Sequence, residues 1–136
     1  MNFWLVKSEP DTYSWDTFVS KSPDIWDGVR NYQARNNLMS MQKGDRVFFY
    51  HSNIGLEIVG IAEVAEEHFP DPTATEGKWV VVRLKPYKKL KQPVSLKTIK
   101  ADPNLADIAL LKQSRLSVVP IRPEEYTYIL GLANEN

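Results

Sequence analysis

The residues best suited to chemistry lie in one twelve-residue stretch, residues 26–37, which reads WDGVRNYQARNN. It combines a tryptophan, a tyrosine and two arginines with several amide side chains. Aromatic faces stack on nucleobases, amides bond the donor and acceptor edge of a base, and arginines contact phosphates. The stretch therefore favours a site that recognises a base. A structural interpretation stays open beside it, in which Trp26 and Tyr32 belong to the core and the amides cap the following helix.

Few residues could support catalysis. The chain has two histidines, His51 and His68, and lacks the H-E-x-x-H, G-x-S-x-G, G-x-G-x-x-G and Walker A patterns. His68 lies near Glu66, Glu67 and Asp71, but a polar loop after a strand gathers such residues by chance. We therefore expect no metal, no cofactor and no catalytic residue. His51 ends an aromatic strand, so it is either a hydrogen-bonded strand end or a polar group that lines a pocket.

Two acidic pairs have spacings that could supply a general acid and a general base. Glu124 and Glu125 are better explained as acids at the positive end of a helix. Asp24 and Asp27 flank Trp26, and the sequence Asp27-Gly28 is typical of a turn, so we expect a structural role for this pair.

Composition narrows the class of protein. The chain has 136 residues, which fits one domain over residues 1–136 with a single core. It has no cysteine, which excludes disulfides and thiolate metal sites. No apolar run approaches the roughly 18 residues of a membrane helix, and no signal peptide is recognisable. We expect a monomer in the cytoplasm, associated with the nucleoid in a bacterium or located in the nucleus of a eukaryote.

Charge is balanced overall but unevenly distributed. The 17 basic and 17 acidic residues cancel, so the chain is not a strongly basic nucleic-acid binder. Between Glu76 and Asp102 there is no acid, whereas eight lysines and arginines lie there. A phosphate backbone could use this segment, although the charge pattern alone favours a solvated basic hairpin with acids packed opposite it from elsewhere in the fold.

Hydrophobic periodicity and turn residues predict strands and short helices in alternation. Strands are expected at residues 3–6, 46–51, 57–64, 79–84 continuing through 87–90, and 116–121, with a bulge or bend at Gly60 and an edge or bulge at Pro86. Helices are expected at residues 15–19, 32–41, 96–100, 105–111 and from 123 to about 131. Short connections argue against parallel βαβ winding and for an α+β domain whose sheet curls into a small barrel.

Several strings, in order along nearly the whole chain, resemble the EVE domain family. They are KSEP at 7–10, WDGVRNYQARN at 26–36, FFYHSN at 48–53, GIAEV at 60–64, PDPT at 70–73 and SRLSV at 114–118. The resemblance implies a PUA-like α+β fold, a curled mixed β-barrel of five to six strands with flanking short helices. It also implies a non-catalytic reader that binds nucleic acid containing a modified base, most simply a modified cytosine of DNA.

The resemblance further implies an aromatic pocket and a rim that contacts the nucleic-acid backbone. For the pocket we expect Trp26 and Tyr32 as walls, together with Ser8, Asn31, Gln33, Tyr50, His51, Ser52 and Asn53. For the rim we expect Lys7, Arg30, Arg35, Lys88, Lys89, Ser114, Arg115 and Ser117. A base enters such a pocket only from a single strand or after flipping, at a cost of a few kcal/mol that stacking offsets.

Two other functions stay open at this point. A PUA-like enzyme acting on RNA or on a nucleobase would combine His51 with Lys7, Glu9 or Arg115 in one cavity. A small-ligand module would take a free metabolite in the aromatic pocket. The chain has no nuclease segment of its own, so a link to restriction would need a separate nuclease as partner.

Overall fold

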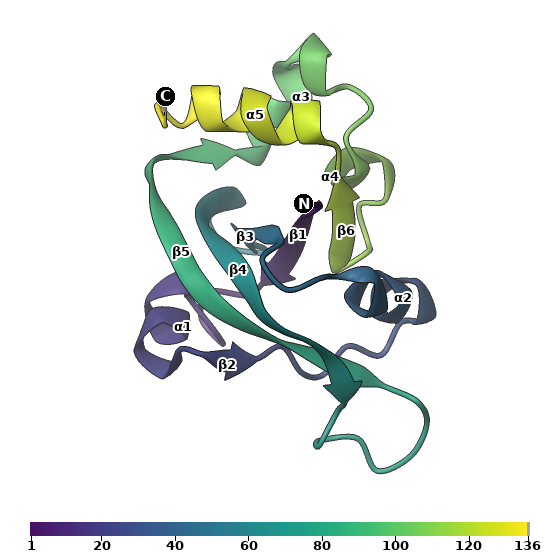
Figure 1. Cartoon of the computed structure of the whole chain (residues 1–136). Helices are drawn as coiled ribbons and strands as arrows, with labels where there is room; N and C mark the ends of the chain where they lie inside the picture. Colours follow the sequence, from purple (N-terminus) through teal and green to yellow (C-terminus); the bar gives the residue numbers. More distant parts are fainter. Residues whose placement is uncertain (136) are drawn as a thin grey trace.

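Six strands form one mixed sheet that curls around the core in this computed structural model, which describes residues 1–135 (Figure 1). The strands are β1 (Phe3–Ser8), β2 (Asp24–Ile25), β3 (Arg46–His51), β4 (Glu57–Pro70), β5 (Val80–Ser95) and β6 (Val118–Ile121). Their order is β2-β5-β4-β3-β1-β6, and the edge strands β2 and β6 do not pair with each other. The α+β class and the six strands are confirmed, but the sheet stays open rather than closing into a barrel.

One pair of strands is parallel, contrary to the expectation of no parallel winding. β1 pairs with β3 in parallel from Phe3 opposite Arg46 to Ser8 opposite His51. The connection between them, residues 9–45, carries two helices and is long enough for a crossover. Both strands consequently end on the same side of the sheet, where Ser8 and His51 lie next to each other.

The antiparallel pair β4 and β5 forms a long hairpin with several bulges. Its register shifts between Ile58 and Gly60 and again beside Pro86, as the sequence predicted for Gly60 and Pro86. A Cβ atom at Gly60 would lie 2.6 Å from the indole ring of Trp15, so only glycine lets this ring pack against the strand. Both strands run further than expected, β4 to residue 70 instead of 64 and β5 to residue 95 instead of 90, and the hairpin loop projects at the lower edge of the molecule (Figure 1).

Short helices cover the sheet, and side chains cap most of their N-termini. They are α1 (Trp15–Lys21), α2 (Tyr32–Ser40), α3 (Leu96–Ala101), the 3₁₀ turn η1 (Pro103–Leu105), α4 (Ala109–Lys112) and α5 (Pro123–Leu132). Ser14, Asn31 and Ser95 accept the capping hydrogen bonds of α1, α2 and α3. At the start of α5, the Glu125 carboxylate accepts a hydrogen bond from the Arg122 backbone N–H. This contact explains one of the two acidic residues in the first turn of the helix. The helix expected at 105–111 is instead η1 followed by α4.

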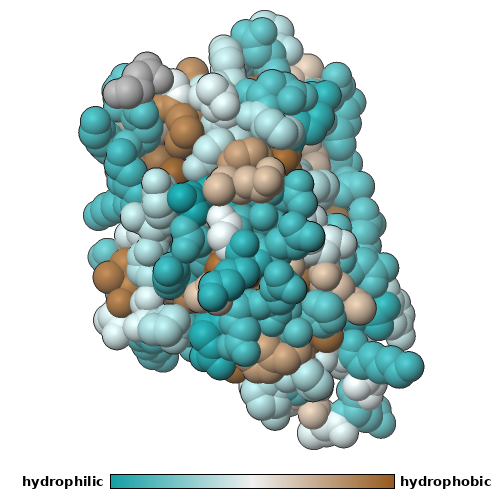
Figure 2. Space-filling model, viewed as in Figure 1, coloured by the Kyte–Doolittle hydropathy of each residue, from teal (hydrophilic) through white to brown (hydrophobic). Residues whose placement is uncertain are grey.

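A continuous apolar core lies inside the curl of the sheet. Phe18 and Phe49 are fully buried and stacked, with ring centroids 5.3 Å apart, and Trp15 meets Phe49 edge-on at 5.4 Å. On the face shown in Figure 2, apolar patches are small and separated by hydrophilic surface. No helix within residues 1–135 has both the length and the apolar character needed to cross a membrane.

Candidate binding site

A cavity of about 670 Å³ opens where β1 ends and the chain turns toward α1. Its walls come from four segments: the end of β1 with the following turn, the C-terminal end of α1, the segment from β2 to residue 30, and the residue just before β6. The lining residues are Lys7, Ser8, Glu9, Thr12, Tyr13, Lys21, Asp24, Ile25, Trp26, Asp27, Gly28, Val29, Arg30 and Ser117. A volume of about 300–1,000 Å³ is typical of sites for small organic groups.

Trp26 provides the large aromatic wall of the cavity. Its backbone N–H donates to the Val82 carbonyl of β5 at 2.8 Å, so the sheet holds the residue in place. Behind the indole, Phe49 packs edge-on at 5.6 Å, and Tyr13 packs edge-on at 5.9 Å. Only 9% of Trp26 is exposed. Trp26 is thus both part of the core and part of the cavity wall, so the two interpretations of this residue hold together.

Tyr13 and Asp24 form a polar pair in the same wall. The Tyr13 hydroxyl donates to Asp24 Oδ2 at 2.6 Å, and the Ile25 backbone N–H donates to Asp24 Oδ1 at 2.9 Å. Burial, the hydrogen bond to Asp24 and the negative charges of Asp24 and Asp27 together raise the pKa of Tyr13. The phenol consequently stays protonated and donates, while Asp24 offers acceptor lone pairs.

The end of β1 fixes the floor and one side of the mouth. Ser8 Oγ donates to the Tyr13 carbonyl at 2.5 Å, which fixes the turn over residues 9–13. Lys7 Nζ donates to the Ser114 carbonyl at 2.7 Å, and the Lys7 backbone N–H donates to the Ser117 carbonyl at 3.0 Å. Burial lowers the pKa of Lys7. Ser114 and Ser117 are therefore joined to the mouth through Lys7.

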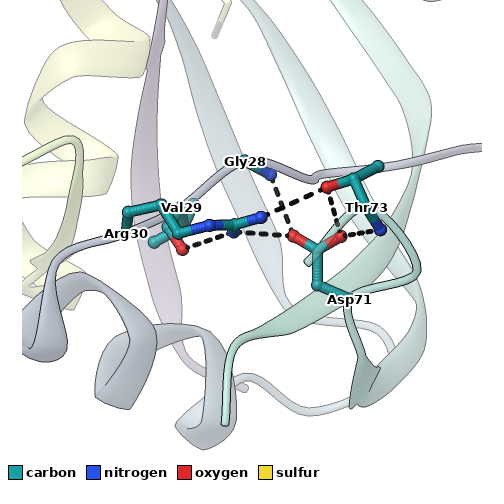
Figure 3. Close-up of polar contacts among 5 residues, drawn as sticks. All are labelled: Gly28, Val29, Arg30, Asp71 and Thr73. Carbon is teal, nitrogen blue, oxygen red and sulfur yellow. Dashed lines mark hydrogen bonds and ion pairs between the residues drawn. The ribbon is translucent and has the colours of Figure 1, made fainter. Parts of the chain in front are cut away.

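Asp71, from the loop of the β4–β5 hairpin, holds the opposite side of the mouth (Figure 3). Its carboxylate accepts from the Gly28 backbone N–H at 3.0 Å, from Arg30 at 2.9 Å and from both donors of Thr73. Burial raises the pKa of Asp71, but the hydrogen bonds from Thr73, Arg30 and Gly28 outweigh it and hold the pKa at about 2. Gly28 has φ +78°, a conformation that favours glycine, so the turn at residue 28 and the carboxylate fix this segment together.

The amide-rich half of the 26–37 stretch does not reach the cavity. Asn31 Oδ1 caps α2 by accepting from the Ala34 backbone N–H at 3.0 Å, as the structural interpretation proposed for the amides. Tyr32 and Gln33 lie exposed on the first turn of α2. Tyr32 stacks on Trp79 with ring centroids 5.1 Å apart, and the Arg35 guanidinium lies 5.1 Å from the Tyr32 ring. The placement of Tyr32 as a cavity wall is corrected: helix α2 starts at this residue and directs its ring outward.

The end of β3 and the turn that follows it support the cavity instead of lining it. Tyr50 is buried, and His51 Nε2 accepts from the Trp15 backbone N–H at 3.1 Å, at the start of α1. Burial lowers the pKa of His51, which fits a neutral acceptor. The Ser52 backbone N–H donates to the Ser8 carbonyl at 2.8 Å, and the Asn53 amide donates to Glu9 at 2.7 Å.

The expected rim residues divide in the same way. Lys7, Arg30 and Ser117 line the cavity, whereas Arg115 and Lys89 are exposed outside its lining and Lys88 pairs with Glu135. The sequence reasoning missed Tyr13, Lys21 and Thr12, and it assigned Asp24 and Asp27 a structural role only. Tyr13 lies in a turn without periodicity, and its place directly before the capping residue Ser14 was the single available clue. Within residues 1–135, no three side chains of His, Asp or Glu are grouped so that they could hold a metal ion.

Comparison with known proteins confirms the resemblance found in the sequence. The family model described as the EVE domain matches residues 2–132. Thymocyte nuclear protein 1 of Mus musculus is 33% identical, and the match covers 96% of this chain and 73% of that protein. A crystal structure of a protein from Agrobacterium tumefaciens has a TM-score of 0.95 at 46% identity, and the match covers 98% of this chain and 93% of the other.

Two further structures bear on the fold. A crystal structure of human THYN1 protein in complex with DNA that contains 5-methylcytosine has a TM-score of 0.90 at 30% identity, covering 100% of this chain and 99% of that chain. The YTH domain of Zygosaccharomyces rouxii MRB1, at 17% identity and a TM-score of 0.63, shares the fold. These likenesses confirm the PUA-like class.

Proposed function

The chain belongs to the EVE domain family, and on that premise we propose that it is a non-catalytic reader that holds a modified base of nucleic acid, most simply a modified cytosine of DNA, in the cavity beside Trp26. The observation that carries the proposal is an aromatic cavity of about 670 Å³ with basic residues at its mouth. The likeness over the full chain to human THYN1 protein, whose structure contains 5-methylcytosine DNA, supports it.

The chemistry of the walls supports a flipped base as the ligand. Stacking on an aromatic ring contributes about 1–3 kcal/mol per base, which offsets the few kcal/mol needed to unstack it. Lys7, Lys21 and Arg30 at the mouth supply positive charge where the phosphates of a flipped nucleotide would remain.

The carboxylates favour particular bases. Asp24 and Asp27 are acceptors, so they match the exocyclic amino group of cytosine or adenine and oppose the carbonyl oxygen at the same position of thymine or uracil. Asp27 is exposed and lies in the same wall as Trp26. We infer a preference for cytosine and adenine derivatives over thymine and uracil.

Binding rather than catalysis fits the titratable groups of the cavity. The raised pKa of Tyr13 leaves it without a role as base near neutral pH, and His51 lies outside the lining with its Nε2 engaged by Trp15. The residues of the enzyme alternative divide between two places: Lys7 and Glu9 line the cavity, whereas His51 and Arg115 are not among its lining residues.

The proposal extends to the setting of the protein. We propose that residues 1–136 act as one domain and as a monomer, located with nucleic acid in the cytoplasm, nucleoid or nucleus. Any cleavage of marked nucleic acid would come from a separate nuclease.

The test is a binding panel with the purified protein at two salt concentrations. Single- and double-stranded DNA and RNA oligonucleotides carry cytosine, 5-methylcytosine, 5-hydroxymethylcytosine or N6-methyladenine at one position, and free nucleosides are included. We expect selective binding of one modified strand with a shallow salt dependence. Equal binding of all strands with a steep salt dependence, or stabilisation by nucleosides alone, would contradict the proposal.

A variant that neutralises one carboxylate tests the role of the acidic side chains in the cavity wall. Asp27→Asn, which places an amide with donors and an acceptor in the wall, should weaken binding of the modified cytosine and reduce the discrimination against thymine. Asp107→Asn removes an exposed carboxylate outside the cavity and serves as the matched control. Equal affinity of both variants for the modified strand would remove Asp27 from the proposed contacts.

A further inference from the structure

A second aromatic surface lies outside the cavity and is joined to it through one arginine. Its members are Tyr32, Trp79 and the guanidinium groups of Arg30 and Arg35. Arg30 lines the cavity, and its Cζ also lies 5.7 Å from the Trp79 ring. The stacked pair therefore begins where the mouth of the cavity ends. We refer to these four residues as the outer platform.

The outward face of Tyr32 is uncovered. The residue is 68% exposed although one face of its ring stacks on Trp79, 5.1 Å away. The Arg35 Cζ lies 5.1 Å from the Tyr32 ring and 5.9 Å from the Trp79 ring. A group on the far side of Tyr32 would be much farther from Trp79 than from Tyr32, so Arg35 lies beside the pair and leaves that face free.

The platform is fixed in position relative to the cavity. The Asp71 backbone N–H donates to the Trp79 carbonyl at 2.9 Å, and the Asp71 carboxylate holds Gly28 and Arg30. A Cβ at Gly77 would lie 2.8 Å from the indole nitrogen of Trp79, so the indole packs directly on this glycine. Two loops distant in sequence thus present one continuous surface.

Charge at the platform fits a polyanion. Among the residues that the structure describes, no carboxylate forms an ion pair with Arg35 or with the exposed Lys78. Within residues 1–135, the side chain of Arg35 donates hydrogen bonds only to the Asn36 amide oxygen. A hollow of about 430 Å³ beside them includes Arg35, Lys78 and Phe69 in its lining, which leaves room for a chain to continue.

We propose that the outer platform binds the nucleotide next to the one held in the cavity, with its base stacked on Tyr32 and its phosphate at Arg35. The inference rests on the proposed function, because it treats the cavity as the place of the modified base. Exposed aromatic rings beside guanidinium groups are the elements with which proteins bind unpaired bases without reading their sequence. The modified nucleotide and a neighbour would thus be bound as a short unpaired strand.

Fluorescence anisotropy with labelled single strands tests the proposal. One series carries the modified nucleotide with three neighbours on each side, and a second series replaces one neighbour at a time by an abasic site. Tyr32→Ala should weaken binding of the full strand about five- to a hundredfold, and one abasic position should weaken wild-type binding while leaving Tyr32→Ala unaffected. The modified mononucleotide should bind wild type and variant equally.

The control for this variant is Tyr87→Ala. Tyr87 is 53% exposed and carries the Arg46 guanidinium 3.8 Å from its ring centroid, yet it lies on β5 outside both hollows. Arg35→Gln adds an independent readout: it should reduce the salt slope of strand binding by about 0.7, as expected for the loss of one phosphate contact on a single strand. Lys97→Gln, an exposed change on α3, should leave that slope unchanged.

The outcomes separate the two proposals. If Tyr32→Ala and Tyr87→Ala both bind the modified strand as the wild type does, the proposal for the outer platform is wrong and the proposal of a modified-base reader stands. If strand binding requires Tyr32 but is equally strong with and without the modification, the proposal for the outer platform stands and the proposal of a modified-base reader is wrong. A wild-type protein that binds none of the strands overturns both, and a loss in Tyr32→Ala that is equally large for the mononucleotide places Tyr32 in the base site itself.

Discussion

The cavity beside Trp26 and the outer platform around Tyr32 share the stretch of residues 26–37 but differ in burial and charge. Trp26 is 9% exposed, packs on Phe49 and lines a cavity that contains both acidic and basic side chains, whereas Tyr32 is 68% exposed and belongs to a surface whose charged members are arginines. The first half of the stretch crosses the mouth of the cavity, and the second half begins a helix on the surface. One sequence motif therefore does not mean one site: a buried cavity wall, Trp26, and an exposed aromatic side chain, Tyr32, lie six residues apart.

The largest expected effect is that of Trp26→Ala. Truncating a large buried aromatic costs about 3–5 kcal/mol of unfolding free energy, and here it also removes the wall of the cavity. We expect a lowered Tm and complete loss of modification-dependent binding, measured by calorimetry and anisotropy. Trp26→Phe keeps an aromatic face and should retain the fold. If Trp26→Phe and Trp26→Ala both bind the modified strand as the wild type does, the modified base does not bind beside Trp26.

An intermediate effect is expected for Asp71→Asn, which should weaken both regions at once. Hydrogen bonds to a charged group contribute about 1.5–3 kcal/mol, and this carboxylate holds Gly28 and Arg30, of which Arg30 belongs both to the cavity lining and to the outer platform. Binding to the mononucleotide and to the extended strand should both decrease. A variant that loses strand binding alone would show that the two regions are held independently.

Acid should reproduce part of this effect. The pKa of Asp71 is about 2 in the folded protein, below the ordinary aspartate value of 3.8, so its contribution to stability is present above pH 3.8 and is lost as the pH falls through about 2. Urea titrations between pH 6 and pH 2 should show wild type losing stability in the window below about pH 4. Asp71→Asn should be less stable at pH 6 and should lack this portion of the acid-induced loss.

The smallest effect is expected for Tyr13→Phe, which should alter binding in the cavity beside Trp26 and leave the outer platform unchanged. The substitution removes the Tyr13 hydroxyl and with it one hydrogen bond to Asp24, worth about 0.5–1.5 kcal/mol, but leaves the ring packing intact. Affinity for the modified base should change a few-fold, while the abasic-site response of the platform stays as in wild type. An altered platform response would mean that the two regions communicate through the turn at residues 9–13.

Sequence reasoning succeeded where local chemistry decides the structure. The strand at residues 46–51 and the starts of the helices at residues 15, 32 and 96 depend on nearby residues, and the structure has them where the pattern predicts. The family strings gave the fold because they extend along nearly the whole chain. The bulge at Gly60 was visible because a lone glycine interrupts an apolar run.

Tertiary contacts decided the rest. The parallel pairing of β1 with β3 depends on a 37-residue connection whose path no local pattern shows. The family resemblance implied Tyr32 as a wall of the pocket, but Tyr32 is the first residue of α2 and lies exposed, outside the cavity lining. Tyr13 lines the cavity and donates a hydrogen bond to Asp24, eleven residues further along the chain. No hydrophobic periodicity in the sequence predicts this contact.

The bond between the Asp71 carboxylate and the Gly28 backbone has a consequence for the entropy of binding. A recognition loop that is disordered when empty loses conformational freedom on binding, and each ordered residue then subtracts from the affinity. Here residues 26–30 are already fastened by Asp71, by Val82 and by the conformation of Gly28. That loss is incurred when the chain folds, so backbone order parameters of these residues should be as high in the empty protein as in the complex.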